Sequence, residues 1–150
     1  MRRTDVEGIR RGIRDRDRQL VRLLNERARL SVEMGRMKAE AGLAVFDPVQ
    51  ERRVLDGIAS LNEGPLPAEA LRSIWREILS ASRTLQAPLS VACLGPEGSF
   101  AHLAALERFG RSTLLAPQVT IGAVFDAVEK RRGDLGVVPL ENSVEGPVRT

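Results

Sequence analysis

The sequence predicts two units of different fold class: an all-α unit of three helices over residues 1–88, followed by a partial α/β unit over residues 89–150. Three observations support this division. Apolar residues recur every three or four positions in the first unit, whereas short apolar runs alternate with helical segments in the second. The charge also differs, since residues 1–88 hold 17 Lys and Arg against 13 Asp and Glu, and residues 89–150 hold 6 against 7.

The first helix is predicted to run from about residue 5 to 41. Thr4 can cap its start, with Glu7 three residues on, and Gly42 follows its end. At 1.5 Å per residue this helix would be roughly 55 Å long. The residues up to Pro88 are too few to cover its apolar stripe, so we expect a second copy of the chain to pair with it in an intertwined homodimer. The stripe comprises Val6, Ile9, Ile13, Leu20, Leu23, Leu24, Leu30, Met34 and Met37.

Two further helices complete the first unit. Asp47 is the predicted N-cap of the second helix, and Pro48 suits its first position, where no backbone N–H is needed. This helix is expected to end at the break Asn62–Pro67, and the third to end near residue 86. One side of the third helix is apolar, with Leu71, Ile74, Trp75, Ile78, Leu79 and Leu85.

The second unit alternates predicted strands and helices. Strands are expected at 90–94, 113–116 and 135–140, with a helix over about 100–109 and another from Thr120 to Gly133. This alternation predicts a parallel sheet. Its ligands would bind at the carboxyl ends of the strands.

Two loops lie at those strand ends. Residues 95–99 (GPEGS) lead into a helix that begins after Ser99, and residues 141–146 (ENSVEG) contain Glu141, Asn142 and Ser143. A helix N-terminus favours anions, so these four side chains form a candidate anion site. Tight strand-to-helix turns explain the same residues equally well.

The composition excludes several classes of protein. With one cysteine, Cys93, and one histidine, His102, the chain lacks the residues for a disulfide framework or a Cys/His zinc site, and both read as ordinary residues of a strand and a helix. No apolar run is long enough to span a bilayer, and the first eleven residues lack the apolar core of a signal peptide. We therefore expect a cytoplasmic protein with no metal, no cofactor and no membrane partner.

Cationic residues of the first helix fall on its apolar side. Arg27 and Lys38 are 11 residues apart, so at 100° per residue they point within about 20° of each other. Arg10 points about 100° away from Arg27. Two cations on a core-facing stripe indicate a buried anionic ligand. Alternatively, their long side chains reach out of the interface to solvent.

Polar pairs on the other two helices can face these cations. Asp47 and Glu51 are four residues apart on the second helix, as are Ser82 and Gln86 on the third, so each pair shares a helix face. Taken singly, Asp47 is a helix cap, and the others are ordinary solvated side chains.

Together, Arg10, Arg27, Lys38, D47-P-x-x-E51 and S82-x-x-x-Q86 resemble the all-helical chorismate mutase family. That resemblance implies a dimer of three-helix chains that converts chorismate to prephenate without cofactor or metal. It implies that Arg27 and Arg10 of the partner protomer bind the substrate carboxylates, and that Ser82 adds a donor. It further implies that Lys38 and Gln86 donate to the ether oxygen and that Glu51, with Asp47, orients the ring hydroxyl. Family members usually carry Arg where this chain has Gln50, which places one substrate contact in question.

Residues 91–110 (VACLGPEGSFAHLAALERFG) and 125–146 (FDAVEKRRGDLGVVPLENSVEG) resemble the beginning of prephenate dehydratase, an enzyme with a periplasmic-binding-protein-like lobe. Mutase followed by dehydratase is the order in the bifunctional enzyme of phenylalanine biosynthesis. The resemblance covers only the first portion of the dehydratase, so we expect no dehydratase turnover from these residues. Ser99, Glu141, Asn142 and Ser143 would be remnants of its prephenate site.

Two other functions compete with mutase activity. The chain could be a non-catalytic module that binds an aromatic-pathway acid, and the change at Gln50 favours this slightly. A basic helical dimer could instead bind nucleic acid. Acidic residues such as Asp15, Asp17 and Glu26 interrupt the arginines of the first helix, so we expect no nucleic-acid partner.

Overall fold

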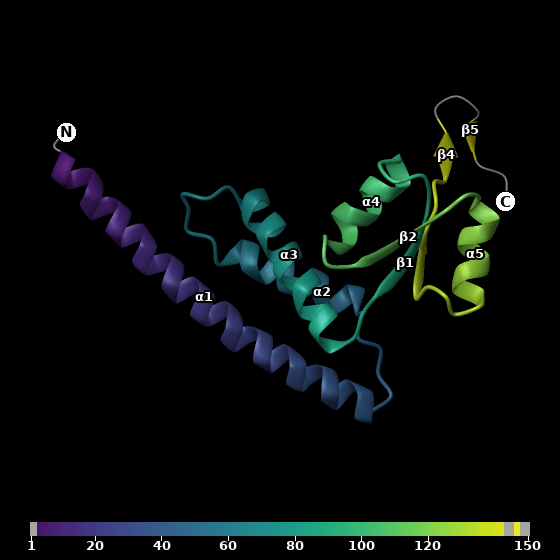
Figure 1. The fold of residues 1–150 in the computed structure, drawn as a ribbon, viewed down its shortest axis with the longest axis horizontal. Coiled ribbons are helices and arrows are strands. Elements are labelled where there is room, and N and C mark those ends of the chain that lie inside the picture. Colours follow the sequence, from purple (N-terminus) through teal and green to yellow (C-terminus); the bar gives the residue numbers. More distant parts are fainter. Residues whose placement is uncertain (1–2, 143–145, 148–150) are drawn as a thin grey trace.

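The computed structural model describes residues 3–142 and 146–147 (Figure 1). Five helices and three parallel strands account for most of them. In chain order the elements are α1 (Arg3–Glu40), α2 (Pro48–Ser60), α3 (Ala68–Gln86), β1 (Ser90–Leu94), α4 (Phe100–Phe109), β2 (Leu114–Gln118), α5 (Ile121–Glu129), β3 (Leu135–Val137), β4 (Glu141–Asn142) and β5 (Gly146–Pro147). The predicted order of helices and strands is confirmed through β3, and the short strands β4 and β5 were not predicted.

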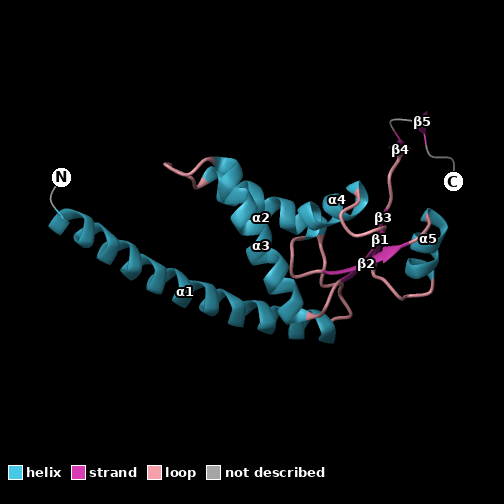
Figure 2. Cartoon of the chain, turned by 45° about the horizontal axis from the view of Figure 1, so that its top comes forward, coloured by secondary structure: helices cyan, strands magenta, loops and turns pink. Residues whose placement is uncertain are grey.

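The long first helix has 38 residues and packs against α3. Its N-terminal part extends beyond α2 and α3 and lies apart from both, as two views agree (Figures 1 and 2). Gly42 follows the helix with a φ of +66°, a conformation that favours glycine and ends the helix. The predicted N-cap is wrong, because α1 already includes Arg3 and Thr4 therefore lies inside the helix.

The apolar stripe of α1 remains largely uncovered by the chain. Ile9, Leu23 and Met37 are 62%, 59% and 59% exposed, respectively. Among the described residues, every buried hydrophobic side chain lies at or beyond Leu89. The three helices thus contribute no buried apolar core of their own within the described part of one chain.

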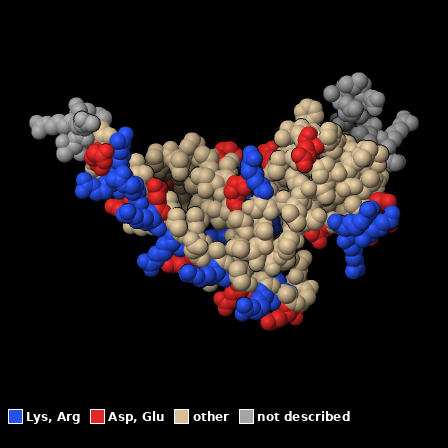
Figure 3. Space-filling view, in the orientation of Figure 1, with Lys and Arg blue, Asp and Glu red and all other residues tan. Residues whose placement is uncertain are grey.

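Charged side chains of α1 are paired along the helix surface. Arg10 pairs with Glu7, Arg18 with Asp15, and Arg22 with Glu26. Basic and acidic side chains accordingly lie next to each other along this element, and both kinds are visible on the face shown in Figure 3. A continuous basic face is the electrostatic signature of nucleic-acid binding, so this distribution does not favour such a partner.

The sheet of the second unit has the order β2-β1-β3, with all three strands parallel. Side chains alternate between its two faces. Val91 and Cys93 of β1 pack with Ala105 and Phe109 of α4, whereas Ala92 packs with Val124 and Ala127 of α5. The sheet is therefore covered by a helix on each face.

The first unit also reaches this core. Phe46, in the segment that precedes α2, packs against the cluster of Val91, Cys93 and Phe109. Its ring meets that of Phe109 edge-on, with 5.4 Å between ring centroids. The segment just before α2 thus packs against the end of α4. None of the described helices is both long and apolar enough to cross a membrane.

Candidate active site

A cavity of about 500 Å³ lies between α1, α2 and α3. It brings together six of the seven side chains that the sequence predicts for one site: Arg27, Lys38, Asp47, Glu51, Ser82 and Gln86. Apolar side chains complete the wall, among them Leu30, Met34, Val54 and Leu79. An apolar pocket with a few convergent polar groups is typical of a small-molecule site.

Arg27 and Ser82 are in direct contact across the α1–α3 interface. The Nη1 of Arg27 donates to the Oγ of Ser82 at 2.5 Å, and that Oγ donates to the backbone oxygen of Ile78 at 2.7 Å. A hydroxyl has a single proton to donate, so here Ser82 orients the guanidinium and does not offer a donor to the cavity. Burial lowers the pKa of Arg27, which nevertheless stays protonated, as arginine does in proteins.

Lys38 lies near the C-terminal end of α1. Its Nζ donates to the backbone oxygen of Val45 at 2.9 Å and so holds the segment between α1 and α2 against the helix. An ammonium group has three donors, so this contact leaves further N–H groups to bind a ligand.

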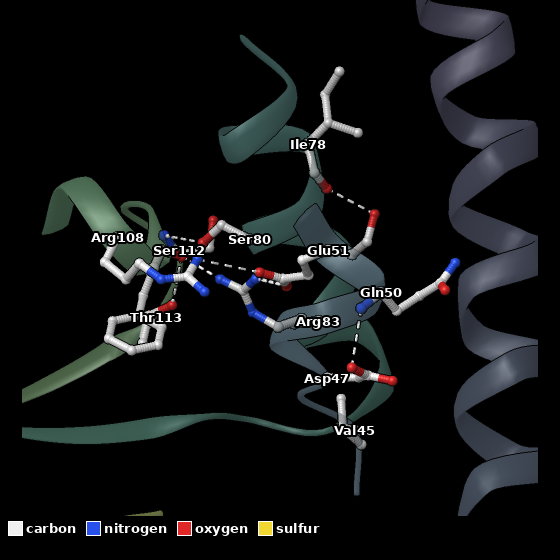
Figure 4. Close-up of polar contacts among 12 residues, drawn as sticks. Val45, Asp47, Gln50, Glu51, Ile78, Ser80, Arg83, Arg108, Ser112 and Thr113 are labelled. Atoms are coloured by element: carbon white, nitrogen blue, oxygen red, sulfur yellow. Dashed lines mark hydrogen bonds and ion pairs between the residues drawn. The ribbon is translucent and has the colours of Figure 1, made fainter. Parts of the chain in front are cut away.

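Asp47 caps α2 as the sequence predicts. Its Oδ1 accepts from the backbone N–H groups of Val49 and Gln50, both at 3.0 Å. Gln50 extends from this first turn toward α1 and lines the cavity (Figure 4). Position 50 therefore faces the cavity in this chain with a neutral amide, the side chain of Gln50.

Glu51 is the most restrained acid of the cavity. Its carboxylate forms ion pairs with Arg83 of α3 and with Arg108 of α4, the latter at 3.7 Å, and Figure 4 shows both arginines on the side of the carboxylate that faces α4. Arg83 is buried and also lines the cavity, yet it was not among the site residues predicted from the sequence. Its place next to Ser82 on α3 was the one available signal.

Gln86 lies at the end of α3, where α1 approaches closely. Its Oε1 is buried and has no hydrogen-bond partner in the described part of the chain. Amide oxygen and nitrogen can exchange places by a flip, so this group is available to a polar ligand as donor or acceptor. Gly35 of α1 lies against it.

Arg10 is the predicted site residue that the structure does not bring to the cavity. It is exposed, and its Nη1 pairs with Glu7 at 3.2 Å. Seventeen residues of helix separate it from Arg27, a distance of about 25 Å. It cannot reach the cavity of its own chain.

The cavity therefore contains two cations without acidic partners. No carboxylate of the described residues forms an ion pair with Arg27 or Lys38, whereas Glu51 is paired with arginines and Asp47 accepts from helix N–H groups. Uncompensated cations in a partly buried pocket favour an anionic ligand. Within the described chain, no cluster of three or more His, Cys, Asp or Glu side chains could hold a metal ion.

In the second candidate site, in the α/β unit, only one of the four predicted side chains, that of Ser99, is described. Ser99 caps α4: its Oγ accepts from His102 N at 3.2 Å and donates to Leu94 O at 2.7 Å, so both functions of the hydroxyl are engaged. The backbone of Glu141 and Asn142 forms β4, but their side chains and all of Ser143 lie outside the described residues. A small cavity of about 250 Å³ lies nearby, lined by Gly95, Pro96, Pro117, Gln118 and Val119. The engagement of Ser99 favours its interpretation as a turn residue.

Comparison with known proteins divides the chain at the same place as its fold. Residues 9–87 match the family model described as "Chorismate mutase type II", and residues 91–150 match the one described as "Prephenate dehydratase". A solved structure of chorismate mutase (Form II) from Thermus thermophilus is 36% identical, with a TM-score of 0.54, and the match covers 55% of this chain and 93% of that one.

Longer relatives span both parts. The bifunctional chorismate mutase/prephenate dehydratase of Aquifex aeolicus is 44% identical over 148 residues, which cover 96% of this chain and 41% of the relative. The protein of the same name from Stutzerimonas stutzeri is 42% identical, and the match covers 95% of this chain and 40% of that relative. The chain thus spans about two fifths of the length of these relatives.

Proposed function

Because the chain belongs to the chorismate mutase type II family, we propose that the cavity between α1, α2 and α3 binds chorismate and rearranges it to prephenate. One observation carries this proposal. Arg27 and Lys38 face a cavity of about 500 Å³ and have no acidic partners among the described residues, which suits a small dicarboxylate.

The proposed catalysis consists of positioning and charge stabilisation. The rearrangement is a single pericyclic step, so it needs a held reactive conformer and donors for the ether oxygen as that bond breaks. In this proposal Lys38 and Gln86 donate to the ether oxygen. Arg27, whose guanidinium is oriented by Ser82, binds one of the two carboxylates of the substrate. Glu51 would accept from the ring hydroxyl, with Asp47 fixing the start of its helix.

We further propose that a second copy of the chain completes the site. The uncovered apolar stripe of α1 supports pairing of two long helices, since exposed apolar surface of this extent is typical of an interface. Arg10 of the partner would bind the second carboxylate, because its own chain keeps it about 25 Å away along α1.

The two parts of the chain match different family models. We assign residues 1–88 to the mutase domain and residues 89–150 to the first part of a prephenate dehydratase N-terminal lobe, based on the family matches and the parallel sheet. We propose that the protein acts in the cytoplasm, as expected from the sequence, in the biosynthesis of phenylalanine.

A chorismate assay tests this proposal. The loss of chorismate absorbance and the formation of prephenate should both accelerate with the whole chain present. Arg27→Ala should lower kcat/KM on the order of a hundredfold or more, because a charge-assisted contact to the substrate is lost. Arg29→Ala, at an exposed position of the same helix, is the matched control and should stay close to the unchanged chain. Binding of chorismate without turnover would instead favour a non-catalytic module.

A further inference from the structure

Glu51 connects the proposed mutase cavity to the second unit of the chain. Its Oε1 pairs with Arg83 of α3, and its Oε2 lies 3.7 Å from Nη1 of Arg108, which belongs to α4. The side chain of Glu51 is only 12% exposed, and that of Arg83 6%. Buried charges persist in proteins when partners compensate them, and here one partner comes from outside the residues that match the mutase family.

Both arginines make further contacts with the aromatic residues Phe46 and Phe109 near the end of α4. Nη2 of Arg83 donates to the backbone oxygen of Phe109, and the Arg83 guanidinium lies 5.6 Å from the ring centroid of Phe46. The guanidinium of Arg108 lies 5.8 Å from the Phe46 ring and 5.7 Å from the Phe109 ring. Cations over aromatic faces are attracted to them, so the arrangement fixes both guanidinium groups.

This cluster lies beside the first turn of α2. Phe46 directly precedes Asp47, the N-cap of α2, and Glu51 follows in that helix's first turn. The end of α4 therefore contacts the segment on which two of the cavity's acidic residues are placed. Figure 4 shows the polar part of the cluster, with Arg83 and Arg108 approaching Glu51 from the side of α4.

We propose that Arg108 is a positioning residue for the mutase reaction: from the second unit of the chain, it holds the Glu51 carboxylate in the orientation that receives the substrate. This rests on the proposed function, in which Glu51 accepts from the ring hydroxyl. Arg83 fixes one carboxylate oxygen and Arg108 the other, so the plane of the carboxylate is set only when α4 is in place. Residues 89–150 thereby contribute to a site whose lining residues all belong to the first unit.

Stability and activity should respond differently to the loss of Arg108. Its side chain is 45% exposed, and exposed ion pairs contribute little to the free energy of unfolding. A group that binds the substrate must be placed to within about 0.5 Å of its productive position. The loss of Arg108 should therefore change KM even where it changes stability little. Arg83 is a poorer probe, because its removal would leave Glu51 without its buried partner.

The test uses the whole chain with Arg108→Gln, Arg108→Lys and a matched control, Arg111→Gln. Arg111 is exposed in the loop after α4, and its backbone N–H, which the substitution retains, donates to Glu77. We expect Arg108→Gln to raise KM for chorismate roughly three- to tenfold with a smaller change in kcat and only a small change in the unfolding midpoint. Arg108→Lys should restore most of the affinity, and Arg111→Gln should leave KM unchanged.

A double-variant comparison separates positioning from a general effect. If Arg108 acts through Glu51, Arg108→Gln should cause no further rise in KM in a Glu51→Gln background. A KM for Arg108→Gln equal to that of the unchanged chain, or full additivity with Glu51→Gln, would overturn the inference while leaving mutase activity in place. Lack of turnover by the unchanged chain would instead refute the proposed function, and the inference with it.

Discussion

Gly35 of α1 and Gln86 of α3 lie so close together that no side chain fits between them. A Cβ atom at position 35 would lie 2.8 Å from the Cβ of Gln86 and 2.9 Å from its Cα. Gly35 thus permits the close approach of the two helices at the place where Gln86 enters the cavity. Glycine lowers the stability of a helix, and at Gly35 the packing of α1 on α3 compensates for this cost.

Gly35→Ala should therefore destabilise the chain and disturb Gln86. We expect a loss of about 1–3 kcal/mol in the free energy of unfolding, as in other overpacked interfaces, together with reduced turnover. Gly57→Ala is the matched control, because nothing lies within 4 Å of a Cβ there and alanine favours the helix. Denaturant unfolding and chorismate assays on both variants test this; a Gly35→Ala chain as stable and active as the original would contradict it.

Lys38→Met should lower turnover far more than stability. The variant keeps the aliphatic stem but removes the donor proposed for the ether oxygen, a loss that typically costs on the order of 10²–10³ in kcat. The lost hydrogen bond to Val45 should lower the free energy of unfolding by only about 1 kcal/mol. Lys130→Met, at the only other lysine, removes an exposed ion pair with Asp126 and serves as control. Survival of full turnover in Lys38→Met would show that the donor is misassigned.

The activity should depend weakly on pH. Gln86 donates through an amide that does not titrate, and Arg27 stays protonated even though burial lowers its pKa. We therefore expect kcat/KM for chorismate to change little between about pH 6 and 9. A steep loss across this window would count against Lys38 and Gln86 as the donors to the ether oxygen.

Cys93 reports on the folding of the α/β unit. It is buried in β1, and burial raises its pKa, so the folded chain retains a thiol proton that the unfolded chain releases above about pH 8.5. Stability from this group is complete below that pH and falls as the pH rises further. We expect a thiol reagent at about pH 8 to label Cys93 slowly in the native chain and rapidly in denaturant. Fast labelling without denaturant would mean that residues 89–150 do not form the described sheet.

Local patterns predicted much of this structure. Features that depend on residues within one or two helical turns were predicted correctly. They are the helix of α1, the Asp47 cap with Pro48 at the start of α2, and the shared face of Ser82 and Gln86, which are four residues apart. Strand ends were less exact. The second strand extends through Pro117, which an edge strand tolerates because its missing N–H needs no partner on the outer side, and the third ends at Val137 before Pro139.

Contacts between distant segments could not be predicted from such patterns. Arg83 lies 32 residues from Glu51, and Arg108 belongs to a different unit, so no helical or strand spacing relates them. The close approach at Gly35 likewise depends on how α1 packs on α3. In a single sequence these positions look like ordinary surface arginines and a weak helix residue.

We propose that the cavity is a mutase site completed by Arg10 of a second copy. Two tagged chains, co-expressed and purified as a mixed dimer, test it directly. A dimer of one Arg10→Ala chain and one Lys38→Ala chain contains one intact site, so it should have about half the turnover of the original dimer. Each variant alone should be nearly inactive.

The matched control places both substitutions in one chain and pairs it with an unchanged chain. Both sites are then defective if Arg10 acts across the dimer, so turnover is expected only in the first arrangement. Half-activity in the second arrangement and none in the first would show that Arg10 serves its own chain. Absence of turnover in every arrangement, with the original dimer included, would contradict the assignment of the cavity.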